Sequence, residues 1–372
     1  MTTQYIVRIR NRAGVRQYDA TDFLALSYSK YVNDVGVLNV DLSGNHQAID
    51  ALEKDGQVEI WRYDDDEDMA PYCDFYGLYR GRNRATPREN KNGIFTMKCV
   101  SQLHFLKRAI IAFYAGTANR NDFSASPAET VMKLMVRYNA TSDATTGNSR
   151  LRTVGTWATH ITYAADTAAG SAITKAFAHR NLLEALQEVA VLGGLDFDLV
   201  KTAAQAWEFR TYTLLGTDRT ATVKFSLEWD NLGDPVLTGN ELDEATVAIV
   251  GGEGVAGARD FDVFTGPNYV AGYNDIETFV NAAQQGATSL EAAGNARLNE
   301  LRARDDFRFN VLQLGAYRYG RDYCVAGALG DKVSVTYYEA QQDKKIRGAH
   351  VMVSNSPGSQ KAEDIRLDMV NA

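Results

Sequence analysis

Gly56-Gln57-Val58-Glu59-Ile60-Trp61 near the start of the chain has a counterpart near its end, Gly330-Asp331-Lys332-Val333-Ser334-Val335. Each stretch is followed by a polar loop, an apolar run, a second polar loop and another apolar run. The pattern predicts two three-stranded meanders, each with a glycine in its second strand, Gly77 or Gly348. The apolar runs are Asp74–Tyr79 and Ile94–Cys99 in the first copy, and Lys345–Val351 and Asp364–Met369 in the second.

Two similar meanders on either side of an unlike middle indicate a duplicated structural unit rather than one catalytic domain, because internal repeats define the architecture of a chain. The alternative is coincidence, since short antiparallel meanders resemble one another even in unrelated proteins. Duplication predicts that Val58–Cys99 and Val333–Met369 have the same fold and occupy equivalent positions.

The composition is that of a folded protein. The 372 residues are enough for two to four domains, and 45% apolar with 23% charged residues is ordinary for a globular chain. The net charge of −8 gives no bulk attraction to DNA or to an anionic membrane, although DNA can pass an acidic surface without adhering to it. We expect neither a signal peptide nor a membrane span, since no apolar run approaches the ~18 residues required.

The first hundred residues predict a β unit. Tyr5–Arg10, Leu24–Val32 and Val37–Leu42 have the composition or the alternation of strands, and Ala48–Leu52 resembles one helical turn. Together with the first meander they make five or six strands. A sheet of that size with short turns closes as a small barrel or a sandwich.

The middle of the chain changes period. A helix is predicted after Ser126-Pro127, and a second over Ala178–Leu192 that ends at Gly193-Gly194. The strand Leu195–Val200 comes next, with Trp207–Tyr212 as its antiparallel partner. The face of the first helix is expected to contain Val131, Leu134, Met135 and Tyr138. Further on we expect a strand at Ala245–Val250, a helix at Thr288–Arg304 and a strand at Val311–Tyr319.

Gly252-Glu253-Gly254-Val255-Ala256-Gly257 matches the GxGxxG pattern of dinucleotide sites and comes directly after an apolar strand. That pattern binds pyrophosphate only when a helix begins directly after it. Here Ala258–Phe264 alternates like a strand, and Pro267 and Gly272 interrupt the next stretch of chain. The segment therefore predicts a glycine-rich turn or crossover, and no cofactor.

No other motif predicts catalytic, cofactor-binding or metal-ligating residues. Asp64–Asp68 is a run of carboxylates without the glycine and the alternation of an EF-hand, which is typical of a solvated loop. Lys107 and Arg108 are expected to face either a partner or solvent, and solvent is favoured because long basic side chains are mostly exposed. The five histidines lack the spacing of a zinc site: His46, His104, His160, His179 and His350. Three cysteines without a CxxC spacing favour buried thiols: Cys73, Cys99 and Cys324.

Read in order, a series of segments resembles the tail-hub (baseplate-hub-like) proteins of long-tailed phages and related gene transfer agents. The order of these segments along nearly the whole chain is more specific than any one of them. They are Val58–Arg62, Phe75–Gly77, Cys99–Arg108, Pro127–Lys133, Asn181–Leu183, Gly193–Phe197, Leu215–Thr220, Gly251–Gly254, Tyr319–Tyr323 and Gly330–Val335.

The resemblance implies a β-rich α+β fold with two tandem tube-type β-barrel domains and an α+β insertion between them. It assigns residues 1–108 to the first barrel, 109–240 to the insertion, 241–264 to strands that contribute to the second barrel, 265–308 to a helical part of the insertion, and 309–372 to the second barrel. Three copies would form a pseudo-sixfold ring, because a duplicated unit presents six similar edges from three chains.

The implied role is a non-catalytic homotrimeric hub in the tail tip or baseplate. Its expected partners are the tail tube or distal tail protein, the tape-measure protein, and a tip or fibre protein, with DNA passing through the lumen without specific binding. The chain ends at Ala372 after the second meander, so we expect no fused hydrolase. The alternatives are a sixfold distal-tail ring or tube-like adaptor, a tail-associated wall hydrolase using Asp and Glu, and a carbohydrate-binding receptor module.

Overall fold

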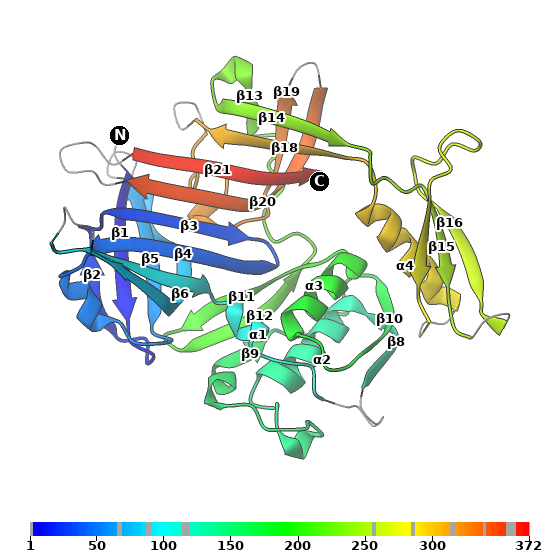
Figure 1. The fold of residues 1–372 in the computed structure, drawn as a ribbon, viewed down its shortest axis with the longest axis horizontal. Helices are drawn as coiled ribbons and strands as arrows, with labels where there is room; N and C mark the ends of the chain where they lie inside the picture. Colours follow the sequence, from blue (N-terminus) through cyan, green and yellow to red (C-terminus); the bar gives the residue numbers. More distant parts are fainter. Residues whose placement is uncertain are drawn as a thin grey trace.

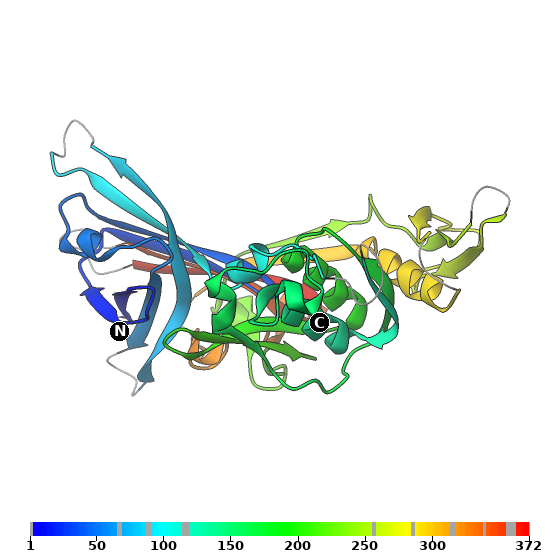
Figure 2. The same ribbon diagram turned by 90° about the horizontal axis from the view of Figure 1, so that it is seen from below.

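A large curved sheet forms most of the molecule, with an α/β unit packed beside it and a small module at one end (Figure 1). The computed structural model describes residues 3–64, 69–86, 91–113, 120–254, 258–283, 287–312, 317–337, 340–354 and 362–371. The β6–β7 hairpin, drawn in cyan, and the small module, drawn in yellow, project from opposite ends (Figure 2).

In the described residues the large sheet has 13 strands, eleven of them in the order β14-β18-β21-β20-β3-β4-β7-β6-β5-β1-β2. Of the other two, β19 pairs with β20 and β13 pairs with β19. Its strands from the first part of the chain are β1 (Thr3–Arg10), β2 (Arg16–Ala20), β3 (Ala25–Tyr31), β4 (Asp34–Ser43), β5 (Gln57–Asp64), β6 (Met69–Ala85) and β7 (Ile94–Ser101). Those from the second part are β13 (Lys224–Ser226), β14 (Leu232–Asn240), β18 (Arg304–Val311), β19 (Lys332–Tyr337), β20 (Ala340–Ser354) and β21 (Ala362–Asn371).

Both meanders predicted from the sequence are present. β5, β6 and β7 pair in antiparallel succession, and so do β19, β20 and β21. Alternating residues of these strands enter one continuous apolar core, for example Leu38, Met97, Val351 and Leu367, each at most 1% exposed. Successive side chains of a strand point to opposite faces of the sheet, so apolar residues that enter the core alternate with polar ones. This alternation is why the strands could be predicted from the sequence.

The expected pair of separate closed barrels is corrected by the strand pairing. The β-rich α+β class is confirmed, but in the described residues neither unit closes on itself, and β20 pairs with β3 so that both units share one sheet. The sequence could not show this, because β3 and β20 are more than 300 residues apart and either strand reads the same whichever neighbour it has.

The α/β unit lies between the two sheet units in sequence. It contains α1 (His104–Lys107), β8 (Asn121–Pro127), α2 (Ala128–Ala140), β9 (Ile161–Tyr163), β10 (Ala172–Phe177), α3 (Leu182–Gly193), β11 (Asp196–Ala203) and β12 (Ala206–Tyr212). The Asn181 side chain caps α3, and Gly194 ends it with a left-handed φ of 65°, as the Gly-Gly signal predicted. The expected face of α2 is partly wrong, since Leu134 and Tyr138 are only half-buried whereas Met132 and Val136 are in the core.

The small module is a separate three-stranded sheet, β15 (Val247–Gly251), β16 (Phe261–Thr265) and β17 (Glu277–Asn281), packed on α4 (Ala287–Glu300). The assignment of 241–264 to the second β unit is therefore wrong, because β15 pairs with β16 and β17 instead. The strand predicted at Val311–Tyr319 is also misplaced, since β18 already ends at Val311. The 3₁₀ turns are η1 (Gln47–Ala51), η2 (Thr146–Asn148), η3 (Thr156–His160), η4 (Leu227–Trp229) and η6 (Val325–Gly327).

Among the helices described, none is both long enough and apolar enough to cross a membrane.

Candidate assembly surfaces

The two β units meet where the second part of β20 runs alongside β3. Seven residue pairs join these strands, from Gly348 opposite Tyr31 to Ser354 opposite Ala25. Just beyond the ladder, the backbone N–H of Val32 donates to the carbonyl of Arg347 at 2.8 Å. This junction is a continuous antiparallel ladder, so it holds the two units rigidly at a fixed register.

A buried polar network lies under this junction, centred on Asp74. Its carboxylate accepts hydrogen bonds from Lys30 and Tyr28, and from the Tyr319 hydroxyl at 3.0 Å. Lys30 also donates to the Gly327 carbonyl at 2.9 Å. Burial, together with the negative charge of Asp74, raises the pKa of both tyrosines well above the ordinary value, so both remain donors. A buried charge satisfied from both β units locks their relative position.

A second ion pair joins the two β units, between β5 of the first and β21 of the second. Arg62 is 3% exposed and binds both carboxylate oxygens of Glu363 at 3.1 Å, while its other nitrogen donates to the Tyr319 carbonyl at 2.9 Å. The planar guanidinium binds both carboxylate oxygens through two parallel N–H groups, a bidentate geometry that the compact ammonium group of a lysine does not reproduce.

Eight strands divide into two half-sheets with the same connectivity. We call β3, β4, β7 and β6 the first half-sheet and β14, β18, β21 and β20 the second half-sheet. In each, the four strands lie side by side in that order, and the last two form the end of a meander. The strand β5 flanks β6 just as β19 flanks β20. The duplication predicted from sequence therefore extends to the strand order.

The likeness reaches individual residues at a bulge in each half-sheet. β6 is bulged at Tyr79-Arg80-Gly81 and β20 at Ile346-Arg347-Gly348, with an arginine as the inserted residue each time. Tyr79 exchanges two backbone hydrogen bonds with Asp55-Gly56, at 2.9 and 3.0 Å, and Ile346 exchanges two with Gly330-Asp331, at 2.9 and 3.1 Å. The first residue of each of these loop pairs is left-handed, with φ of 66° and 94°. Bulges act as designed features, so their match supports descent from one unit.

This alignment corrects the glycine chosen from sequence. The residue that corresponds to Gly348 is Gly81, after the bulge, and not Gly77. A Cβ added to Gly348 would lie 3.0 Å from the Tyr31 ring and 3.3 Å from the Lys30 carbonyl, both on β3. A Cβ added to Gly81 would meet only Lys98, at 3.6 Å. The two positions differ because a strand borders β20 here and none of the described strands borders β6.

Two strand edges are consequently open. The pairing of β5 with β6 ends at Leu78, so within the described residues the last part of β6 has only β7 as a neighbour. At the other end of this order of strands, β14 has β18 as its one neighbour among the described strands. The side chains there are exposed, including Asn83, Ala85, Thr238 and Val236, the last of these 55% exposed. An open edge presents unpaired backbone N–H and C=O groups, to which a further strand can bind.

The α/β unit is tied to both β units by buried carboxylates. Asp196 accepts from Lys345 of β20 at 2.7 and 2.6 Å, and Glu59 of β5 accepts from Lys201 at 2.7 Å and from Arg10 at 2.9 Å. Burial alone would raise the pKa of Glu59, but these hydrogen bonds outweigh it and hold the pKa below its ordinary value. The α/β unit is thereby fixed against the sheet.

Within the α/β unit, Glu129 at the start of α2 gathers the loop after β9. It accepts from Lys133, from the backbone N–H of Thr167 at 3.0 Å and Ala169 at 2.9 Å, and from Thr211 at 2.8 Å. Burial opposes ionisation, but these donors prevail and lower the pKa of Glu129 to about 2. Glu129 is therefore a structural anion rather than a general acid or base.

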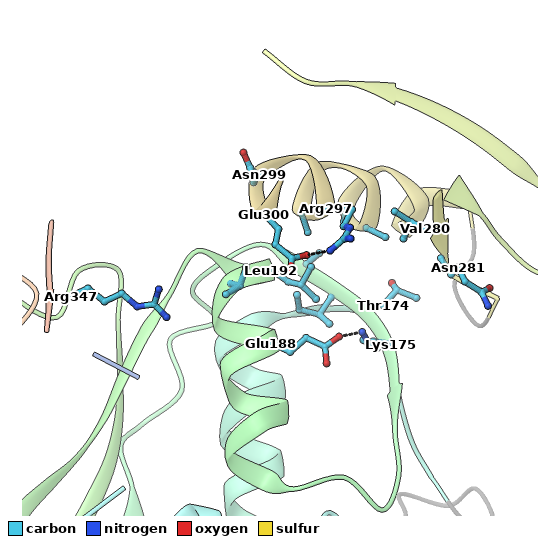
Figure 3. Close-up of a pocket in the computed structure, with 17 residues that line it drawn as sticks. Thr174, Lys175, Glu188, Leu192, Val280, Asn281, Arg297, Asn299, Glu300 and Arg347 are labelled. Carbon is cyan, nitrogen blue, oxygen red and sulfur yellow. Dashed lines mark hydrogen bonds and ion pairs between the residues drawn. The ribbon is translucent and has the colours of Figure 1, made fainter. Parts of the chain in front are cut away.

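A cleft of about 550 Å³ lies between the α/β unit and the small module (Figure 3). Lys175 and Glu188 form an ion pair on one wall, and Arg297 and Glu300 form another on the α4 side, at 2.7 Å. Much of the remaining lining is alanine, and Arg347 lies at the edge. Each of these two ion pairs is formed within one wall, so neither of them crosses the cleft.

The structure also places the segments singled out by sequence. Gly252 and Glu253 begin a connection that is closed by backbone hydrogen bonds with Asp260, at 2.8 and 3.0 Å. The described part of the GxGxxG segment therefore links β15 to β16, and no α-helix lies between these two strands in the described residues. Arg108 does not face solvent as expected, because it pairs with Asp55 and stacks over the Phe105 ring. Residues 65–68 of the acidic run lie outside the described residues.

The histidines do not converge, and no group of three or more possible metal ligands was found among the described residues. His350 bonds Asp368 at 2.7 Å and Ser29 at 2.8 Å, on the polar face of the sheet. Sequence reasoning missed Asp74 and Lys30, whose partners come from distant strands. It could have found the Arg-Gly repeat at 80–81 and 347–348, which is visible in the printed chain.

Solved structures with a similar fold include phage and prophage tail proteins. A tail protein from Neisseria meningitidis MC58 has a TM-score of 0.59 at 9% identity, covering 99% of this chain and 97% of that one. The 43 kDa tail protein of prophage MuSo2 from Shewanella oneidensis has 0.59 at 10%, covering 99% and 98%. Prophage tail protein gp18 from Listeria monocytogenes has 0.57 at 11%, covering 98% and 94%. None of the curated proteins compared with this chain matches it.

The fold is therefore that of phage and prophage tail proteins, the kind of protein that the ordered segments of the sequence implied. Within that class the chain belongs to the Siphovirus ReqiPepy6 Gp37-like protein family, whose sequence model matches residues 6–356.

Proposed function

We propose that the protein is a structural component of the phage virion, a tail-tip or baseplate hub in which three chains form a pseudo-sixfold ring around the DNA channel. The observation that carries the proposal is the pair of equivalent half-sheets in one chain. Two equivalent units per chain convert three copies into six similar positions, which suits a joint between a sixfold tube and threefold tip proteins.

The partners in this proposal are the tail tube or distal tail protein on one face and a tip or fibre protein on the other, with the tape-measure protein in the lumen. The acidic net charge of −8 supports a channel to which DNA does not adhere. The role needs no catalysis and no cofactor, and the cleft and the anionic clusters described above all serve packing. Solved neighbours include a PdpA–VgrG complex, in which a protein of this fold is bound to another.

The test is the number of chains in the ring. The purified full-length chain, followed by native mass measurement over rising concentration, is expected to form a species of three times 41.0 kDa. A species of six chains would favour a sixfold distal-tail adaptor. A monomer at every concentration up to the millimolar range contradicts the ring. Lysis of host cell wall by the pure protein would overturn the structural role.

A further inference from the structure

We infer that the ring closes by strand addition, with the end of β6 in one copy pairing antiparallel with β14 of the next copy. This inference rests on the proposed ring and names the surfaces that build it. The junction would reproduce between chains the β20–β3 ladder that already exists within each chain.

The two half-sheets lie next to each other as equivalent units. In the order β14-β18-β21-β20-β3-β4-β7-β6, the second half-sheet is followed directly by the first. At the centre, the last strand of one half-sheet, β20, pairs with the first strand of the next, β3. At the two ends stand the counterparts of those same strands, β6 and β14, each with one edge open in the described part of the sheet. If β6 of one copy binds β14 of the next in the way that β20 binds β3, each added copy extends the same arrangement of half-sheets, and the last copy can close a ring with the first.

The backbone of β6 is oriented for such an addition. Tyr79 directs its N–H and C=O away from β7, toward Asp55-Gly56. Antiparallel strands alternate between residues that bond one neighbour and residues that bond the other, and the bulge inserts one residue. Arg82 and Arg84 therefore also direct their N–H and C=O away from β7, at the open edge. Their counterparts in β20, Ala349 and Val351, lie opposite Lys30 and Tyr28 of β3.

The register of the new pairing is set by the bulges. In each half-sheet, residues that lie directly opposite one another form a row across the four strands. The row that contains Tyr79 in the first half-sheet corresponds to the row that contains Ile346 in the second. The rows are Tyr79, Cys99, Leu38 and Tyr28 in the first half-sheet, and Ile346, Met369, Phe307 and Leu237 in the second. The internal pairs Gly348–Tyr31, His350–Ser29 and Met352–Ser27 then predict three pairs between copies. These are Gly81 opposite Asn240, Asn83 opposite Thr238, and Ala85 opposite Val236 of the next copy.

The side chains at these positions fit the assignment. Asn83 and Thr238 would take the places of His350 and Ser29, which are hydrogen-bonded at 2.8 Å. Ala85 would cover Val236, an aliphatic side chain that is 55% exposed in the single chain. None of the six residues in these three pairs is charged, so none of these pairs places an unpaired charge in the contact.

Paired cysteines test the register in the full-length chain. Directly opposite residues bring Cβ atoms within about 4.5–5.5 Å, close to disulfide reach, whereas a slip of one residue places them on opposite faces. Oxidation of the Asn83→Cys/Thr238→Cys variant is expected to give covalent dimers and trimers and nothing larger. The register-shifted pair Arg82→Cys/Thr238→Cys, and each single variant, should give only monomers on the same non-reducing gel.

The outcomes separate the junction from the ring. A species of three chains in which N83C/T238C fails to cross-link, or cross-links no better than R82C/T238C, overturns the junction while the proposed ring stands. Failure of every variant and of the native chain to form a three-chain species contradicts the proposed function itself. Cross-linking within one chain would be seen as a faster-migrating monomer, and it too would overturn the inference.

A backbone probe gives an independent readout. Arg84→Pro removes one N–H from the open edge and takes no bond from the β6–β7 ladder, because proline is tolerated where the N–H faces away from the sheet. Arg84→Ala removes the same side chain and keeps the N–H. The ring should weaken at least tenfold more in R84P than in R84A, with the unfolding midpoint of the two chains alike. Equal ring formation by both variants contradicts the strand addition.

Discussion

The two half-sheets keep the same strand order and the same arginine bulge, yet they differ in what joins and borders their strands. In the first half-sheet β3 turns directly into β4 at Val32-Asn33, whereas in the second the whole small module is inserted between β14 and β18. β3 is bordered by β20, and β14 has no such neighbour among the described strands. The duplication therefore conserved backbone pairing, and the loops and edges diverged.

Their polar interiors differ as well. The pairing of β5 with β6 shifts register between Ile60 and Trp61, which places Asp74 at a bulge, while β19 and β20 pair without interruption. Bulges redirect side chains. The Asp74 network therefore belongs to the internal junction, and the β19–β20 pair has no bulge that would place a matching carboxylate there. Four pairs of variants test how the half-sheets and the α/β unit are held, in decreasing order of their expected effect.

The greatest loss of stability is expected from Asp74→Ala. It leaves Lys30 buried without its carboxylate and deprives Tyr28 and Tyr319 of their acceptor, so the free energy of unfolding should fall by about 3–5 kcal/mol in a urea titration. Lys30→Met combined with Asp74→Leu should restore much of that loss. If D74A unfolds within about 0.5 kcal/mol of the native chain, the network does not hold the junction.

Proline at the counterpart of Arg84 should act very differently from R84P. Val351→Pro breaks the internal ladder to β3 and removes a side chain from the core, and we expect a loss of about 3 kcal/mol or more. Val351→Ala is the matched control and should cost less. Thermal unfolding followed by circular dichroism measures both. Equal tolerance of proline at 84 and 351 would mean that the two edges are not an open and a paired version of one strand.

Acid should weaken the α/β unit through Glu129. Its folded pKa of about 2 lies below the ordinary 4.5, so the stabilisation is complete above pH 4.5 and is lost as the pH falls toward 2. Glu129→Gln should lower the free energy of unfolding at pH 7 by on the order of 2–3 kcal/mol and flatten its decline between pH 5 and 3. The exposed Glu184→Gln on α3 serves as control. An unchanged acid slope in E129Q argues against this anchor.

The smallest difference is expected between two glycines. Gly348→Ala forces its methyl group against Tyr31 and the Lys30 carbonyl, and should cost about 1 kcal/mol in denaturant titration. Gly81→Ala meets only ordinary contact with Lys98, and the single chain should tolerate it within about 0.5 kcal/mol. A larger loss of stability in Gly81→Ala than in Gly348→Ala would contradict the assignment of the bordered strand to β20 and of the open edge to β6.

Local patterns predicted much of the chain, because alternation and capping are recorded in neighbouring residues. Both meanders, the end of α3 at Gly194 and the β11–β12 hairpin were readable in this way. The start of α3 was placed too early, at Ala178, because the cap formed by Asn181 was not recognised. The rejection of the GxGxxG segment as a helix-bound phosphate site depended on the strand after it, now seen as β16.

Long-range choices could not be predicted. Nothing in β15 specifies that it leaves the large sheet for a module of its own, since an apolar strand fits either neighbour. The Asp74 network unites side chains from residues 28, 30, 74 and 319, which no sequence window contains. The shared sheet arises because β20 pairs with β3, a contact set by tertiary packing.

A density map of the assembled ring, at a resolution that separates strands, would examine the proposed assembly itself. We expect three chains, with β6 of each beside β14 of the next, Asn83 opposite Thr238, and six quasi-equivalent strand junctions around the channel. A ring in which β6 and β14 both remain unpaired, or in which the two half-sheets occupy unlike positions, would contradict closure by strand addition between equivalent units.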